Sequence, residues 1–450
     1  MKSLSSITIF FLAGLLVICT SLFAANENKE KHLFRSSRAP GKIHCVKVRL
    51  KTGGNVIDVV NSKENKEKIS VECNLDYDEK ILSSSAKVDG VARAARYYSN
   101  AEVKIQIGSQ NFEPVLAPDH SLIVAEIAPQ KSLLFSPLGT LTSKELDLLD
   151  VPGNNLLLDR FLPEKPVAVG DTWKHSEKLL ALFLCLDEVG SADVHSTLKE
   201  VTDRLARFEM SGKVAGAVEG VSTEIEIKAR YRFDRKRNCI DWLGMLIKEK
   251  RNSSPISDGL DVVSQLQITE IPADKNEHLS DENLKELPLQ STPELLRLSH
   301  YSKLGGWELS YDRNWHICRD QQDVAVLRRL ENGELIAQCN LSSLPSGKSE
   351  KLVSLEEFQE DVKRALGKDF KEFVEAEQTI DEMKRRVLRV LARGTASELP
   401  ILWTYYHIAD KQGRRMGCVF TLEEKYAERF GKADQDLLRS LKFKEQATQP

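Results

Sequence analysis

Cysteine and histidine side chains are the first candidates for chemistry in this chain, which holds eight cysteines and nine histidines. His316 and Cys318 stand two residues apart, so a strand would present both on one face. Farther on, a hairpin with a two-residue turn would set Tyr405 opposite Cys418, with His407 diagonal to it. Nucleophilic catalysis requires a nucleophile beside an oriented base, and such pairs arise easily by chance in this composition. We therefore expect core or strand-surface roles, and we assign no catalytic residue.

Metal and phosphate sites are not indicated either. His-Glu-x-x-His and Cys-x-x-Cys are absent, and the glycine pairs 53–54 and 305–306 mark turns. Asp76 and Asp78 alone are typical of a solvated strand end. The aromatic side chains of Trp315, Trp403 and the Tyr405–Tyr406 pair would line a groove or, as is commoner, pack across strands. We expect no metal and no cofactor.

Seven cysteines follow residue 25: Cys45, Cys73, Cys185, Cys239, Cys318, Cys339 and Cys418. An odd number leaves at least one thiol free or paired between chains. Cys318 and Cys339 lie in strands that hairpins could make neighbours, so a disulfide bridge between them is one expectation. Buried, unbonded cysteines are the alternative at every position.

The first 25 residues have the pattern of a secretory signal peptide. Lys2 precedes an apolar stretch over 7–22, small residues follow at Ala24 and Ala25, and a polar run begins at Asn26. A retained anchor is the alternative. We expect export to the periplasm or the extracellular space, and a mature chain that does not span a membrane. With 64 basic and 67 acidic residues, the chain shows no electrostatic signature of nucleic-acid binding.

Residues 41–272 predict a large antiparallel β-rich domain. Short bursts alternate apolar and polar residues, as in Val46, Val48 and Leu50. Similar bursts recur in the second half, so the domain is either duplicated or one large sheet. Short helices are expected over 143–150 and 154–160. A polar, acidic stretch over 273–296 predicts a linker to a second domain.

Residues 297–445 predict an α+β domain. Asn332-Gly333 is a strong hairpin turn, and Ser354 with Glu357 forms the capping box of a helix. Strands are expected over 308–311, 315–318, 323–330, 334–344, 385–393, 400–409 and 414–422. A final helix is expected over 423–430.

Two segments resemble known families. In the C-terminal domain, Tyr311-x-x-x-Trp315, the helix start at 354–358 and Ser440-Leu-Lys-Phe443 resemble the PsbP-like fold, an antiparallel sheet flanked by helices. That resemblance implies accessory, assembly or binding roles and no shared catalytic motif. The segment 163–173, Pro-Glu-Lys-Pro-Val-Ala-Val-Gly-Asp-Thr-Trp, resembles one found in uncharacterised secreted bacterial β-rich proteins. It implies architecture only.

Three function classes follow from the sequence. The first is an exported, non-catalytic binding or assembly protein whose partner is an unidentified protein or an apolar ligand. The second is a periplasmic carrier that holds an apolar ligand in a half-open β-barrel, which requires a concave apolar face rather than a packed one. The third is a hydrolase or thiol enzyme, which requires a pocket with perturbed titratable groups.

The leader generates one prediction. N-terminal sequencing of protein isolated from its native host should give a mature terminus near Ala25 or Asn26. Recovery of intact Met1 in cytoplasmic protein would refute export.

Overall fold

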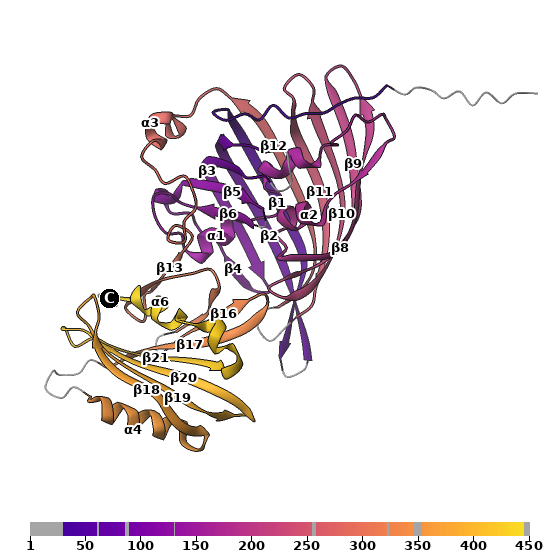
Figure 1. The fold of residues 1–450 in the computed structure, drawn as a ribbon. Helices are drawn as coiled ribbons and strands as arrows, with labels where there is room; N and C mark the ends of the chain where they lie inside the picture. Colours follow the sequence, from indigo (N-terminus) through magenta and orange to yellow (C-terminus); the bar gives the residue numbers. More distant parts are fainter. Residues whose placement is uncertain are drawn as a thin grey trace, which may run out of the picture.

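The computed structural model describes residues 30–60, 63–85, 90–129, 131–253, 258–321, 324–345 and 353–444. The leader and the predicted mature terminus lie outside the described residues. Figure 1 shows a large curved sheet, with a smaller C-terminal domain at one end of it. Within the described part, no helix has both the length and the apolar character needed to cross a bilayer.

The first domain is a single 12-stranded antiparallel sheet. Its strands are β1 (Ile43–Val60), β2 (Lys63–Ser83), β3 (Ala92–Ile107), β4 (Gln110–Phe112), β5 (Leu122–Ala128), β6 (Lys131–Phe135), β7 (Thr172–Lys174), β8 (Glu188–Val201), β9 (Leu205–Val218), β10 (Val221–Asp234), β11 (Cys239–Arg251) and β12 (Gly259–Ala273). The large antiparallel β domain is thereby confirmed, and of the two sequence alternatives the structure has one continuous sheet.

The strand order places both chain ends of the domain in the middle of the sheet. The order is β6-β5-β3-β2-β1-β12-β11-β10-β9-β8-β7, and β1 pairs with β12 from Ile43↔Ala273 to Ile57↔Gly259. The sheet is therefore an up-and-down meander whose outer edges are β6 and β7. Since these two strands do not pair with each other, the sheet curls without closing.

Alternation along the strands gives the sheet one buried face and one exposed face. Val46, Val48 and Leu50 are buried on the concave side, whereas Lys47 is exposed on the other. This pattern repeats across the central strands, so the concave face is apolar and the convex face is polar.

Residues 136–171 connect the two unpaired edges and lie on the concave face; we call them the plug segment. The segment holds α1 (Ser143–Leu149), capped by the Thr142 box, and the 3-10 helix η2 (Asn155–Phe161). These are the two helices expected from sequence. A further helix, α2 (Glu177–Leu184), was not expected and packs against β8 and η2. Figure 1 shows α1 and α2 on the inner side of the sheet.

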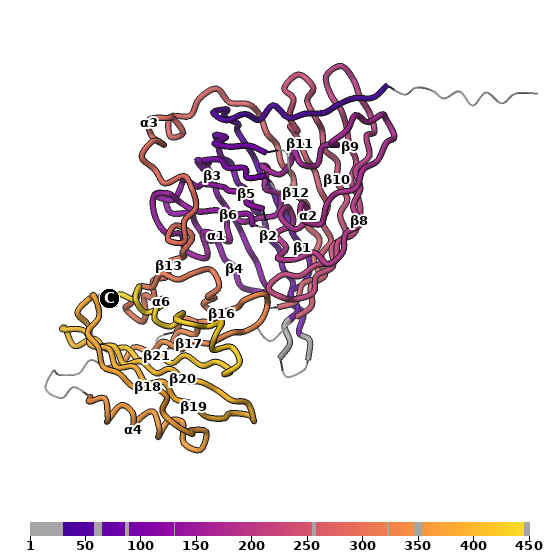
Figure 2. Tube along the Cα trace, in the orientation of Figure 1, coloured from indigo at the N-terminus to yellow at the C-terminus, as the bar shows by residue number. Residues whose placement is uncertain are grey.

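A second covering element is the N-terminal strap, residues 30–42, which Figure 2 shows running across one end of the large sheet. Its backbone pairs with the plug segment, since His32 N–H donates to the Val167 carbonyl at 2.8 Å. The Phe34 ring packs edge-on against Phe208 and Phe233. The strap thus ties the plug segment to the sheet beneath it.

The C-terminal domain is the expected antiparallel sheet flanked by helices. Seven strands run in the order β15-β16-β17-β21-β20-β19-β18. Their bounds are β15 (Trp315–Asp320), β16 (Ala325–Glu331), β17 (Glu334–Leu344), β18 (Phe370–Ile380), β19 (Arg386–Ala396), β20 (Leu399–Ala409) and β21 (Arg415–Glu423). Helix α4 (Leu355–Leu366) covers β18 and β19, and α5 (Ala427–Phe430) and α6 (Ala433–Arg439) follow β21.

In this domain the predicted helix start and hairpin turn are confirmed, but some of the predicted strand pairings are wrong. The Ser354 capping box is confirmed, as is the hairpin at Asn332-Gly333, where both residues have positive φ. The predicted strands at 308–311 and 315–318 belong to different sheets. The first is β14 (Trp307–Tyr311), which pairs with β13 (Leu298–Ser302) and β22 (Lys442–Phe443) in a separate three-stranded sheet. Strand β18 was missed, because its exposed positions do not alternate.

The predicted linker over 273–296 connects the two domains, and much of it packs against the first domain. It contains η3 (Glu277–Leu279) and α3 (Asp281–Leu284), and the buried Leu279 and Leu284 pack with Ala95 and Leu122 of the large sheet. Lys80 anchors it with an ion pair to Asp281 at 2.7 Å. The segment is therefore attached to the first domain along much of its length.

Two hairpin tips, one from each domain, contact each other. Gly220, in the β9–β10 turn, and Gly333, in the β16–β17 turn, meet backbone to backbone. A Cβ placed on Gly333 would lie 2.1 Å from the Gly220 Cα, and φ at Gly333 is +76°. Only glycine fits at this contact.

Gly333→Ala should therefore separate the hairpin tips and lower the free energy of unfolding by about 2 kcal/mol, part of it from positive φ alone. Gly41→Ala is the matched control, because Gly41 has φ +84° and open space around its Cβ position. Urea unfolding of both variants measures the difference. Equal losses would show that the tip contact contributes nothing.

Candidate functional site

The structure does not bring together the cysteine and histidine side chains that the sequence offered as candidate catalytic pairs. Cys318 is exposed on edge strand β15, and its Sγ lies 3.7 Å from the His316 carbonyl oxygen. The His316 ring instead lies 3.6 Å from the Glu219 carboxylate. Partial burial raises the pKa of the Cys318 thiol. These two residues therefore do not form an activated thiol–imidazole pair.

The predicted register of the β20–β21 hairpin is wrong by one residue. Tyr406, not Tyr405, lies opposite Cys418, and His407 lies opposite Gly417. The turn is longer than the two residues assumed, because the Asp410 carboxylate accepts hydrogen bonds from the Gln412 and Arg414 backbone N–H groups. Burial raises the pKa of the Cys418 thiol and lowers that of His407, so neither is poised as nucleophile or acid.

The expected Cys318–Cys339 bridge is also wrong. Strand β16 lies between β15 and β17, with Leu327 paired to both Ile317 and Cys339. All seven cysteines in the described part of the chain are free.

The four aromatic side chains line no groove. Trp315, Trp403 and Tyr406 are buried, and Tyr405 packs against the α4 side of the sheet. They serve as core, as the commoner interpretation of such residues predicts.

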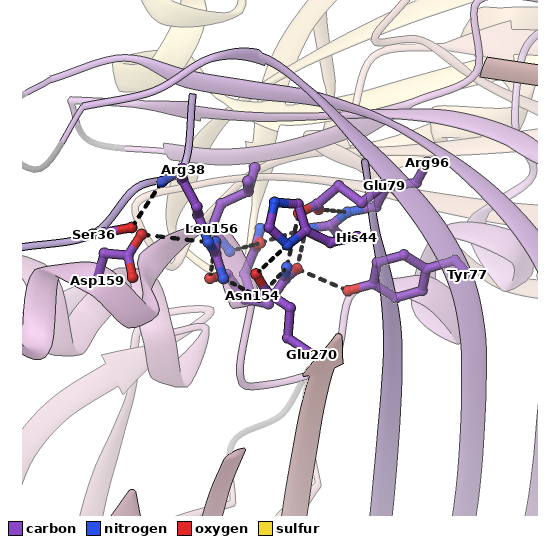
Figure 3. Close-up of polar contacts among 11 residues, drawn as sticks. Ser36, Arg38, His44, Tyr77, Glu79, Arg96, Asn154, Leu156, Asp159 and Glu270 are labelled. Atoms are coloured by element: carbon purple, nitrogen blue, oxygen red, sulfur yellow. Dashed lines mark hydrogen bonds and ion pairs between the residues drawn. The ribbon is translucent and has the colours of Figure 1, made fainter. Parts of the chain in front are cut away.

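Instead, the concave face of the first domain contains a set of interacting charged and polar side chains, shown in Figure 3. We call it the buried charge cluster. Its members come from the strap, four strands and the plug segment: Arg38, His44, Tyr77, Glu79, Arg96, Asn155, Asp159 and Glu270. Alternation explains its position, because Glu270 follows Leu266 and Ile268 on the inward face of β12.

Asn155 of the plug segment is the centre of the cluster. Its side-chain amide donates to Glu79 at 2.8 Å, and its side-chain carbonyl accepts from the Tyr77 hydroxyl and from Arg96, each at 2.9 Å. Arg96 also donates to Glu79 at 2.8 Å. One asparagine thus links the plug segment to β2 and β3.

Arg38 links the strap to the same centre. It donates to the Asn155 backbone carbonyl at 2.7 Å, pairs with the Glu270 carboxylate, and lies 3.3 Å from Asp159. His44 Nδ1 lies 3.0 Å from the other Glu270 oxygen. The strap, β1, β12 and η2 therefore meet at one carboxylate.

Burial and partner charges act in opposite directions on these acids. Burial raises the pKa of Glu270, but contacts with Arg38, His44 and Asn155 lower it by more than burial raises it. The net shift of this pKa is therefore downward. For Asp159, burial outweighs the attraction of Arg38, and its pKa is raised. These contacts link the strap, the sheet and the plug segment to one another. Nε2 of His44 is buried and has no hydrogen-bond partner in the described part of the chain.

The binding-site candidate is the cleft between the two domains, with a volume of about 900 Å³. Its walls come from the β6 edge, the end of α2, the β9–β10 turn, the linker and the 312–316 turn of the C-terminal domain. The residues that line it include Leu133, Asp150, Ala181, Leu182, Cys185, Asp187, Glu219, Leu296, Arg313 and His316.

Cys185 is the one thiol in the cleft wall. It ends α2 in the left-handed conformation, with φ 55° and ψ 44°. Burial, followed by the negative charges of Asp150 and Glu249, raises the pKa of this thiol well above its usual value. A thiolate is the nucleophilic form, so these surroundings oppose thiol catalysis.

Other titratable groups of the cleft are engaged in structure. Arg313 donates to the backbone carbonyls of Leu296 at 2.8 Å and Leu134 at 2.6 Å, which joins the domains. Burial lowers its pKa. Loss of water around its carboxylate raises the pKa of Asp150 to about 6. The residue keeps an exposed surface, so solvent screens the charge of this carboxylate.

Neither the buried charge cluster nor the cleft was predicted from the sequence. The only signal for the buried charge cluster is that charged residues occupy inward positions of predicted strands, such as Glu79 and Glu270. The cleft has no local signal, because its walls come from segments far apart in the chain.

Comparisons with known proteins give no family and weak structural likeness. No family model and no curated protein matches the chain. Among solved structures, cyanobacterial PsbP from Synechocystis sp. PCC 6803 is 16% identical, with a TM-score of 0.26, over 35% of this chain and 99% of that one. Lipovitellin is 8% identical, with a TM-score of 0.30, over 52% of this chain and 25% of that one. The PsbP match agrees in part with the C-terminal resemblance.

The cluster generates a stability prediction. Arg38→Met leaves Glu270 and Asp159 buried without their cation, so the free energy of unfolding should fall by about 3 kcal/mol. Arg207→Met, which removes an exposed pair with Glu200, should cost less than about 1 kcal/mol. Urea titration followed by circular dichroism compares them. A loss no larger than the control's would contradict a structural role for the cluster.

Glu270 also generates a pH prediction. Because folding lowers its pKa, its charged form stabilises the fold above the ordinary glutamate pKa of about 4.3, and this stabilisation is lost as pH falls through the lower folded value. The stability difference between wild type and Glu270→Gln should therefore shrink between pH 7 and pH 3. Urea unfolding at several pH values measures it. A pH-independent difference would exclude an ionised Glu270.

Proposed function

We propose that this protein is an exported, non-catalytic binding or assembly protein whose partner engages the interdomain cleft. The observation that carries this proposal is the cleft itself, about 900 Å³ in volume and walled by both domains and the linker. A partner bound there contacts both domains at once, so binding fixes their relative position. Export rests on the leader sequence.

The side chains of the cleft support binding rather than turnover. The Cys185 thiol is held protonated, Arg313 is bonded to backbone carbonyls, and the His316 ring faces Glu219. Acyl transfer requires a nucleophile, a base and an oxyanion-binding pair around one point. These three side chains are each committed to other contacts.

The chemistry of the walls describes the partner. Asp150, Asp187 and Glu219 provide acceptor oxygens, and Leu133 and Leu182 provide apolar surface. A protein segment with basic or amide donors beside an apolar side chain fits this mixture better than a wholly apolar molecule does.

A second candidate function is a carrier of an apolar ligand. The specific observation in its favour is that the large sheet presents a concave apolar face and stays open between β6 and β7. That face is filled by the chain itself, so the carrier function requires the plug segment to leave.

Cysteine alkylation tests the cleft directly. Lys131→Cys places an exposed thiol in the cleft wall, whereas Cys318 is exposed outside the cleft, so fractions of the host's cell envelope that contain the partner should slow iodoacetamide labelling at residue 131 only. Ala181→Trp, which fills the cleft, should abolish this protection, whereas Lys228→Trp on the convex face should not.

The proposal is contradicted if Ala181→Trp keeps the protection, because the partner would then bind elsewhere. It is equally contradicted if every protecting fraction slows both thiols alike.

A further inference from the structure

The concave face of the first domain carries an inference that goes beyond the cleft. The plug segment lies where a half-open barrel would hold its ligand. We propose that the plug segment is displaceable and that the concave face beneath it binds a slender apolar chain, such as a fatty acyl group, in its place. This deepens the second candidate function and is independent of the cleft.

The plug segment presents to the sheet the kind of surface that an apolar ligand would present. The plug contributes buried aliphatic and aromatic side chains, namely Leu148, Leu149, Leu156, Leu157, Leu158 and Phe161. The sheet meets them with apolar side chains of its inward positions, and Gly153 is so close to β12 that a Cβ there would lie 2.6 Å from the Leu266 side chain. A molecule that replaces the plug therefore meets an apolar surface.

The plug is attached to the large sheet mainly by side chains. Between residues 143 and 166, the backbone hydrogen bonds of the described chain run within the segment or to Phe183 of α2. In this middle part, side chains supply the polar links to the sheet, through Asn154, Asn155 and the Tyr231 hydroxyl, which donates to the Phe161 carbonyl at 3.2 Å. Backbone bonds to other elements lie at the ends of the plug segment, where Val167 pairs with His32 of the strap and residues 170 and 171 bond to Leu198 of β8. The middle of the segment can therefore leave the sheet without breaking a strand ladder, while its ends stay attached.

The helices of the plug are short, which lowers the cost of moving them. Helix α1 and the 3-10 helix η2 have seven residues each. Isolated helices of this length are marginal in water, so their order depends on packing against the sheet. The open seam between β6 and β7 gives the segment a path outward.

The buried charge cluster is suited to a contact that forms and breaks reversibly. A permanent core gains little from Arg38, Arg96, Glu79 and Glu270, since apolar residues of similar volume commonly stabilise as well or better. Charged and amide groups instead specify one seating of the plug. They are also readily solvated once it leaves, which an apolar contact is not.

The test uses the full chain and the fluorescent fatty acid cis-parinaric acid. Tyr77→Phe with Tyr231→Phe removes two hydroxyl links to the plug and leaves its apolar contacts. Because the open form becomes more populated, the apparent Kd for the probe should fall roughly tenfold. Tyr406→Phe is the matched control, since it removes a buried hydroxyl bonded to Asp434 in the other domain.

Trypsin reports whether the plug moves. Arg160 is 6% exposed in the closed form, so cleavage after it should become faster when the probe displaces the plug. Probe binding without faster cleavage at Arg160 would overturn the proposal, because the site would lie elsewhere. Absence of probe binding to the Tyr77→Phe/Tyr231→Phe variant would overturn it as well.

These outcomes separate this inference from the cleft proposal. Failure of the probe to bind leaves the protection of residue 131 by an envelope partner unaffected. Loss of that protection leaves the fatty-acid result unaffected.

Discussion

The architecture of the first domain depends on the contact between Arg38 and Glu270. Glu270 lies on β12, Arg38 on the strap, and the Asn155 carbonyl that Arg38 also binds lies on the plug segment. The sheet remains open, so its concave apolar face needs a cover, which the strap and the plug segment supply. A sheet of this kind without its cover would expose a large apolar surface to water.

This arrangement explains why so many charges lie in an apolar interior. Desolvating a carboxylate or a guanidinium costs several kcal/mol each, and the pairing of Arg38 with Glu270 and of Arg96 with Glu79 offsets that cost. Hydrophobic contacts alone are not directional, so they would permit the leucine-rich plug to slide along the face. Hydrogen bonds at Asn155 fix it in one place.

The two domains contribute differently to function in this account. The first domain holds a covered apolar face. The second domain lies at one end of the large sheet and forms part of the cleft wall. Arg313 and the glycine contact between residues 220 and 333 join them. The cleft is walled largely by turns, the linker and a helix end, as is common for binding sites on rigid scaffolds, whereas the second candidate site is the concave face of the large sheet.

Local patterns in the sequence predicted elements well and neighbours poorly. Alternation at Val46, Val48 and Leu50 predicted the strand and its buried face, and Ser354 with Glu357 predicted a helix start. Pairing depends on distant segments, which explains why Cys318 and Cys339 proved to be separated by β16. A single extra turn residue after Ala409 shifted the Tyr406–Cys418 register. The plug segment was expected as helices, but no local signal placed it on the concave face.

The central claim is that the plug segment is held on the sheet as a separate, less stable unit. Native-state hydrogen exchange of the unliganded protein measures this, by comparing amides of residues 155–162 with those of β1 and β12. The account predicts that the plug amides exchange through a partial opening, of lower free energy and weak denaturant dependence, while the strand amides exchange only on global unfolding. If both sets exchange with the same free energy and the same denaturant dependence, the plug is a permanent part of the core and the account is contradicted.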